Sequence, residues 1–322
     1  MKILLHTILW ILTSTTSIYA QQTVQQFAQQ RDTSYTLNSA LQKAKRLNKE
    51  KDISIAAVHS NPSKKIKTES EIVYKTLDER TLSANIFYPK KKYKNAIPGI
   101  LMIHGGGWRS GDKSLMTPMA EKLAASGYFV IAPEYRLSPE ASYPAAVLDL
   151  YDAIVWMSKH AKKYNINMDQ IVVMGCSAGG QLAALVGTTY NQPENIYQKE
   201  KYGHIAAIID VDGVLAFINP DSQEGEVAGL WLGGTSKEVP EIWEEASALN
   251  HVDQYTPATL FLASIYPRFL AGRQEYVEKL KTFKTYTETH FMDRAPHSFW
   301  LFNPWFEPTM EYILDFLKTN FK

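Results

Sequence analysis

A serine in a glycine-rich turn is the residue of this chain best placed to act as a nucleophile. Residues 175–180 read Gly-Cys-Ser-Ala-Gly-Gly. They contain the pattern G-x-S-x-G, in which the glycines allow a sharp turn from a strand into a helix that exposes the serine hydroxyl. The apolar run 171–174 precedes the turn and a helical pattern follows it, as this geometry requires. We therefore predict that Ser177 is a catalytic nucleophile.

A second glycine-rich segment offers hydrogen-bond donors to a negatively charged oxygen. Residues 104–107 read His-Gly-Gly-Gly and follow the apolar run 98–103. Because glycine carries no Cβ, the main chain of such a segment can approach a ligand closely. We expect the amides of Gly106 and Gly107 to converge with the amide of Ala178 as an oxyanion hole.

His297 is the residue that we expect to act as general base. Acyl transfer needs a nucleophile, a base that takes its proton, and a group that holds the base in the right tautomer. His297 lies in the loop 293–297, directly after a proline, between the last predicted strand and the last predicted helix. The order of the three segments along the chain indicates a serine hydrolase.

Strand-like and helical patterns alternate through residues 71–322. The predicted strands are 72–76, 83–88, 99–104, 128–133, 171–176, 206–212, 259–264 and 285–291. The predicted helices are 114–126, 145–163, 178–189, 273–283 and 308–318, and the loop 219–234 is expected to form a small cap. This alternation predicts an α/β fold with a mostly parallel central sheet of about eight strands flanked by helices. Reactive groups should then lie at the carboxyl ends of the strands.

These motifs together resemble the α/β-hydrolase superfamily, and within it the esterase and lipase group related to hormone-sensitive lipase and to bacterial carbohydrate esterases. The resemblance covers roughly residues 70–320 and rests on four stretches: 104–108, 133–137 with 144–149, 175–180, and 296–299. It implies an α/β-hydrolase fold and ester hydrolysis, with Ser177 as nucleophile and His297 as base. It also implies the oxyanion hole of Gly106, Gly107 and Ala178, and a role for His104 in orienting that loop.

The acid that should orient the histidine is missing from its usual place. Most relatives carry an aspartate in the loop after the seventh strand, but here the loop 263–273 holds Arg268 and no carboxylate precedes Glu275. In lipases of this superfamily the acid can move to the end of the sixth strand. We predict Asp212, at the end of the run 206–212, as the acid. The alternatives are Asp210, Asp293, Glu307 or no acid at all.

Several residues are candidates for contact with the substrate. A guanidinium can bind a carboxylate through two hydrogen bonds, so Arg268 and Arg273 could hold the acid group of a uronic-acid sugar. The alternative is that these arginines pair with Glu275 or Glu278. The aromatic residues that we expect to contact substrate are Trp108 and Trp231.

The carboxylates of Asp149 and Asp152 are expected to be structural. Both lie near the start of the predicted helix 145–163. Helix capping or an ion pair with Arg136 fits them better than a part in catalysis.

Composition excludes some function classes and indicates others. The formal net charge is +1 with acids and bases interspersed, which predicts no nucleic-acid partner. The single cysteine, Cys176, excludes an internal disulfide and is expected to be a core residue. No cluster of side chains has the spacing of a metal site, and we expect neither a metal nor an organic cofactor.

The N-terminal region has the pattern of an export signal. Residues 1–20 combine a basic start, a short apolar run and small polar residues up to Ala20, which predicts a signal peptide. The run is too short for a spanning helix, so no stable membrane insertion is expected after cleavage. Residues 21–70 predict a polar extension and linker with one possible helix near 37–49, and residues 71–322 predict the catalytic domain. A periplasmic or secreted bacterial protein is the expected location.

The sequence therefore predicts an exported serine carboxylesterase. It would remove acetyl or related ester groups from plant-type polysaccharide fragments through an acyl-enzyme on Ser177, and its partner would be a small-molecule or oligosaccharide ester. Two alternatives remain open. One is an arylformamidase or peptidase on the same scaffold, and the other is a catalytically silent relative that binds carbohydrate.

Overall fold

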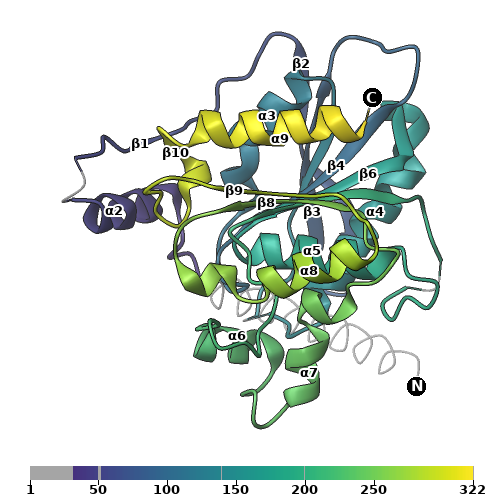
Figure 1. The fold of residues 1–322 in the computed structure, drawn as a ribbon. Coiled ribbons are helices and arrows are strands. Elements are labelled where there is room, and N and C mark those ends of the chain that lie inside the picture. Colours follow the sequence, from purple (N-terminus) through teal and green to yellow (C-terminus); the bar gives the residue numbers. More distant parts are fainter. Residues whose placement is uncertain (1–31, 50–51, 139, 199, 322) are drawn as a thin grey trace, which may run out of the picture.

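A computed structural model describes residues 32–49, 52–138, 140–198 and 200–321 of the chain. The predicted signal peptide lies outside the described residues. An eight-stranded sheet forms the centre of the structure, with the strand order β2-β3-β5-β4-β6-β7-β8-β9 (Figure 1). Its strands are β2 (Ile66–Thr76), β3 (Thr81–Pro89), β4 (Ile97–Ile103), β5 (Phe129–Pro133), β6 (Ile166–Cys176), β7 (Ile205–Val211), β8 (Ala258–Ala263) and β9 (Thr287–Phe291).

Most of the sheet is parallel, as predicted. The pairs β2–β3 and β3–β5 are antiparallel, whereas every pair from β5 through β4, β6, β7 and β8 to β9 is parallel. The apolar runs of the inner strands are buried on both sides because helices cover both faces. In β4, for example, Leu101 and Ile103 point into one core, while Ile100 and Met102 point into the other.

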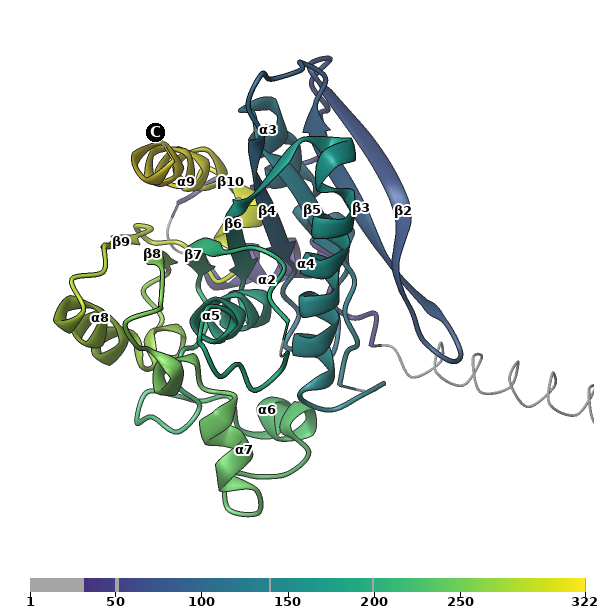
Figure 2. The same cartoon turned by 90° about the vertical axis from the view of Figure 1, so that its right-hand side faces the viewer.

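Two layers of helices enclose the sheet (Figures 1 and 2). Helices α4 (Ala145–Tyr164), α5 (Ala178–Tyr190) and α8 (Arg273–Thr282) pack into one core. Helices α3 (Thr117–Ala125) and α9 (Phe306–Asn320) pack into the other. The short 3-10 helix η1 (Lys113–Met116) precedes α3, so the predicted helix 114–126 is divided in two. Eight strands between two helical layers confirm the predicted α/β-hydrolase architecture.

The segment between β7 and β8 carries the cap. It contains α6 (Gly225–Leu232), α7 (Pro240–Glu245) and the 3-10 helix η2 (Ala248–His251). The expected cap loop 219–234 thus includes α6. No helix within the described residues is long and apolar enough to cross a membrane.

The described residues of the N-terminal extension, 32–49 and 52–70, pack against the domain, whereas a linker was expected there. Helix α2 (Leu37–Leu47) begins with a capping box between Thr36 and Ser39 and buries Ala40 and Ala44. Strand β1 (Ala56–Ala57) pairs with β10 (Phe302–Asn303), close to the C-terminal helix α9. A polar composition hid this packing because the two buried side chains of α2 are small.

The first turns of α4 are held to the sheet by a buried carboxylate, and the predicted ion pair with Arg136 is confirmed. Asp149 is fully buried, and its Oδ1 lies 2.8 Å from Arg136 Nη2 and 2.7 Å from Lys75 Nζ. Lys75 belongs to β2 and also lies 2.7 Å from the half-exposed Asp152. The pair therefore joins the edge strand β2 to α4.

Removing this buried charge should destabilise the fold. Asp149→Asn leaves two cations without their buried partner, so the free energy of unfolding should fall by about 3 kcal/mol. Asp152→Asn is the matched control, because this carboxylate is 44% exposed and binds the same lysine; its loss should cost under about 1 kcal/mol. Urea unfolding of the two variants checks both values. Equal losses would contradict the structural role of Asp149.

Candidate active site

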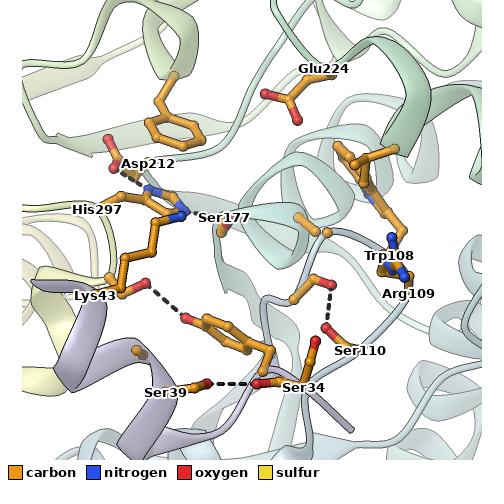
Figure 3. A pocket seen from close by; sticks show the side chains of 18 of the residues that line it. Ser34, Ser39, Lys43, Trp108, Arg109, Ser110, Ser177, Asp212, Glu224 and His297 are labelled. Carbon is orange, nitrogen blue, oxygen red and sulfur yellow. Dashed lines mark hydrogen bonds and ion pairs between the residues drawn. The ribbon is translucent and has the colours of Figure 1, made fainter. Parts of the chain in front are cut away.

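Three side chains that are distant in the sequence form one hydrogen-bonded chain (Figure 3). Ser177 Oγ lies 2.9 Å from His297 Nε2. On the other side of the ring, His297 Nδ1 lies 2.7 Å from Asp212 Oδ2. Ser177 follows β6, Asp212 follows β7, and His297 lies in the loop after β9. All three therefore lie beyond the carboxyl ends of strands, where an open parallel sheet places its reactive groups.

The backbone around Ser177 forms the expected sharp turn. Ser177 has φ 57° and ψ −123°, a conformation that L-residues rarely adopt, and its amide donates to Val211 O at 2.8 Å. Glycine is required at position 175, because a Cβ there would lie 1.9 Å from the carbonyl oxygen of Gly179. The turn presents the serine hydroxyl at the first turn of α5, where the helix dipole favours negative charge.

Asp212 is fixed from its other side by Ser264, a residue that the sequence analysis did not single out. The Ser264 amide donates to Asp212 Oδ1 at 2.8 Å, and the Ser264 hydroxyl lies 2.7 Å from Oδ2. Both side chains are buried. Ser264 is the residue after β8, so the strand that carries the acid in most relatives here supplies donors to an acid on β7. The sequence signal that could have identified Ser264 is its position at the end of a predicted strand, four residues before Arg268.

The other carboxylates proposed for this role lie elsewhere. Asp210 Oδ1 accepts a hydrogen bond from the Gly213 amide at 2.9 Å, and burial raises the pKa of its carboxyl well above the usual range. Asp293 pairs with Arg294 at the surface, and Glu307 is exposed and pairs with Lys122.

Aromatic rings hold the imidazole of His297 in its plane. The ring of Phe269 stacks on it with a centroid distance of 3.7 Å and an angle of 9°. Trp300 meets it edge-on at 5.3 Å. Phe269 lies in the 3-10 helix η3 (Pro267–Leu270), within the same loop that carries Arg268. This loop thus supplies a stacking surface to the histidine in place of a carboxylate.

The glycine loop after β4 lies beside Ser177. Gly106 has φ +134°, and a Cβ there would lie 2.1 Å from Ser110 O, so the tight turn needs glycine at this position. Its carbonyl accepts from the Ser110 amide at 3.0 Å. Within the described residues, the amides of Gly106, Gly107 and Ala178 donate to no other group, and all three residues line the same cavity. They are therefore available to a developing oxyanion.

His104, at the start of this loop, is buried. Its ring stacks on Tyr135 with a centroid distance of 4.5 Å, and its Nδ1 lies 2.9 Å from Gly105 O. The Tyr135 hydroxyl donates to His104 O at 2.9 Å. These contacts fit the positioning role that the family resemblance implied.

A cavity of about 600 Å³ opens in front of the three residues. Hydroxyl-bearing side chains line part of it, and Ser34, Ser39 and Ser110 lie together on one side in Figure 3. Val214 and Val227 line another part. Cys176 is buried behind the nucleophile, and burial raises the pKa of its thiol well above the usual range, as a core cysteine requires.

Arg268 lines this cavity, but its guanidinium has a partner. Nη2 lies 3.0 Å from Glu224 Oε1, and the Cζ atom lies 4.6 Å from the ring centroid of Phe269. Glu224 is buried at the start of α6, while the Arg268 side chain is 41% exposed. The partner is thus neither Glu275 nor Glu278. The positive charge of Arg268 is thus already compensated by the carboxylate of Glu224.

The other predicted substrate contacts need correction. Trp231 is fully buried and stacks on Trp108 with a centroid distance of 5.1 Å, so its ring cannot touch a substrate. Trp108 lines the cavity but is only 2% exposed, because its indole N–H donates to Gln181 inside the core. Arg273 is buried with its guanidinium over the Phe291 ring. Hydrophobic burial explains these positions, since both indoles complete the core behind the glycine loop.

Among the residues that the structure describes, no group of three or more His, Cys, Asp or Glu side chains is arranged to hold a metal ion.

Comparison with known proteins places the chain in a family. Residues 84–264 match the family model described as BD-FAE, which is more than half of the chain, and the chain belongs to that family. Protein R526 of Acanthamoeba polyphaga mimivirus is 26% identical over 271 residues, which cover 77% of this chain and 73% of R526. Esterase LipC of Mycobacterium tuberculosis is 27% identical over 175 residues, which cover 51% of this chain and 43% of LipC.

Solved structures share the fold. Esterase B from Lactobacillus rhamnosis aligns with a TM-score of 0.68 and 20% identity, covering 87% of this chain and 92% of that protein. A truncated carbohydrate esterase from gut microbiota aligns with a TM-score of 0.62 and 21% identity, covering 80% and 99%. The fold, the family and the esterase relatives together identify the chain as a carboxylic ester hydrolase of the serine-hydrolase class.

Proposed function

We propose that this chain is an exported serine carboxylesterase that removes acetyl or related short acyl groups from plant-type polysaccharide fragments. The observation that carries the catalytic part is the hydrogen-bonded chain from Ser177 through His297 to Asp212, at 2.9 Å and 2.7 Å. Export rests on the signal-like residues 1–20, and the carbohydrate substrate rests on the hydroxyl-lined cavity.

Each residue of the site has a part in the reaction. Ser177 Oγ attacks the ester carbonyl carbon while His297 Nε2 takes its proton. The amides of Gly106, Gly107 and Ala178 stabilise the oxyanion of the tetrahedral intermediate. His297 then gives its proton to the leaving alkoxide, which departs as the alcohol and leaves an acyl group on Ser177.

In the second half of the reaction, water hydrolyses the acyl-enzyme and takes the part that Ser177 had as nucleophile. His297 takes a proton from water, whose oxygen attacks the acyl carbonyl, and Ser177 leaves with that proton as the free hydroxyl. Asp212 keeps the proton of the neutral histidine on Nδ1, so that Nε2 is free to act as base, and it stabilises the imidazolium that forms. Ser264 holds Asp212 in place for this role.

The packing behind the glycine loop supports a short acyl group. Trp108, Trp231 and Phe217 fill the interior beyond the loop, with ring centroids 5.1 to 6.1 Å apart. A long acyl chain that extended from Ser177 behind the glycine loop would have to displace these rings, and packed cores resist such displacement. Ser34, Ser39 and Ser110 on the opposite side suit the hydroxyl groups of a sugar alcohol.

The nucleophile is tested by Ser177→Ala. We expect kcat for p-nitrophenyl acetate to fall on the order of 10⁴-fold or more, because the triad residues act as a unit. The matched control is Cys176→Ala, which removes the neighbouring buried thiol and should leave kcat within a few-fold. Retention of a tenth of the turnover by Ser177→Ala would exclude the serine mechanism. An inactive wild type would favour the alternative of a catalytically silent relative that binds carbohydrate. Preference for an anilide over the ester would favour the alternative of an arylformamidase or peptidase.

Acyl preference is tested with a series of p-nitrophenyl esters. We expect kcat/KM to be highest for acetate and to fall steadily towards octanoate, because the packed rings leave no room for added methylenes. Trp231→Ala should shift the preference towards longer chains by opening that space. A wild-type preference for octanoate would contradict the short acyl pocket and place the activity among lipases.

A further inference from the structure

The segment before the predicted catalytic domain forms one wall of the active-site cavity. Residues 32–47 contribute a third of the described residues that line it, including Asp32, Tyr35 and Lys43. Figure 3 shows this wall on the side of the cavity opposite the cap residue Glu224. The wall lies outside the four stretches that carry the motifs of the reaction.

Two contacts fix this wall to the catalytic residues. The Tyr35 hydroxyl lies 2.8 Å from Ser298 Oγ, next to His297, and burial raises the pKa of Tyr35 to about 12, so that it stays protonated. Asp32 Oδ2 lies 2.8 Å from Arg109 Nε, two residues after Gly107. The wall is thus tied at one point to the histidine loop and at another to the glycine loop.

Helix α2 presents one face to the cavity. The lining residues follow helical spacing, at positions i, i+3, i+4 and i+7: Ala40, Lys43, Ala44 and Leu47. The two alanines are buried, which brings the helix close to the domain. Lys43 lies between them on this face and is exposed to solvent, so its ammonium group can reach the cavity on a flexible stem.

The charges that line the cavity are almost all paired. Asp32 pairs with Arg109, Glu224 pairs with Arg268, and Asp212 binds His297. Lys43 lines the same cavity and forms no ion pair with any described residue. Among the described residues that line the cavity, Lys43 is therefore the one cation whose charge is not already neutralised by a neighbouring carboxylate.

We propose that Lys43 is a specificity-determining residue that selects esters whose alcohol part carries a carboxylate, as in an acetylated uronic-acid sugar. This inference rests on the proposed function and assigns the anionic subsite to Lys43 instead of Arg268. An ammonium on a solvent-exposed stem binds a carboxylate without first breaking an existing ion pair. It contributes to substrate binding equally in the ground state and the transition state, so it acts on KM.

The test compares acetylated galacturonate oligosaccharides with acetylated neutral xylo-oligosaccharides. Lys43→Ala should raise KM for the uronate ester about threefold to tenfold, with kcat unchanged and with no effect on the neutral ester. Added salt should weaken uronate binding by the wild type and not by the variant. Lys45→Ala is the matched control. Lys45 belongs to the same helical turn as Lys43, but its side chain does not line the cavity. Lys43→Arg should restore the wild-type KM.

Direct binding separates this proposal from the proposed function. Unesterified galacturonate oligosaccharide is titrated into the wild type and into Lys43→Ala by calorimetry, a readout that needs no turnover. If Lys43→Ala binds the oligosaccharide more weakly than the wild type, the anionic subsite is supported. This holds even if the enzyme hydrolyses neither ester, since a lack of hydrolysis would contradict only the proposed function. Equal binding by both proteins, or equal KM changes for the uronate and neutral esters, would overturn the role of Lys43.

Discussion

The hydrogen bond between Asp212 and His297 is the interaction on which the rest of the site depends. It joins a residue at the end of β7 to a loop after β9, across the position that β8 occupies between them in the sheet. Ser264 at the end of β8 bridges the gap by donating to the carboxylate from below. The loop after β8 therefore does not supply the acid. It provides Phe269, which stacks on the imidazole, and Arg268, which forms an ion pair with Glu224 of the cap.

Several residues at this edge of the sheet have a strained backbone conformation. Ser177, Asp212, Ser298 and Trp108 all have positive φ values although none is glycine. Such conformations persist only where surrounding contacts over-determine them, and each of these residues is held by hydrogen bonds or ring stacking. The strained conformations at the site lower the stability of the fold, and the burial of the two apolar cores on either side of the sheet offsets this loss.

The sequence predicted the fold and the motif residues well because those signals are local. A buried strand, a G-x-S-x-G turn and a helix are each visible within a dozen residues. Because the usual loop has no carboxylate, Asp212 was the preferred acid, although Asp210, Asp293, Glu307 or no acid remained as alternatives. The contacts that were missed or wrong join residues far apart in the chain. Ser264 binds Asp212, Glu224 rather than Glu275 pairs with Arg268, Trp231 is buried against Trp108, and Tyr35 reaches Ser298. Composition alone could not show that the polar N-terminal segment would return to the active site.

The most direct test of the account is the turnover of Asp212→Asn. The asparagine amide would face His297 Nδ1 and favour the tautomer with its proton on Nε2, which cannot accept a proton from Ser177. We predict that kcat for p-nitrophenyl acetate falls by up to about 10⁴-fold while the unfolding midpoint changes little. Asp293→Asn, at the exposed alternative position, should keep wild-type turnover. A disabled triad should lose far more than about threefold in kcat. If the kcat of Asp212→Asn stays within about threefold of wild type, the assignment of Asp212 as the residue that orients the histidine is contradicted.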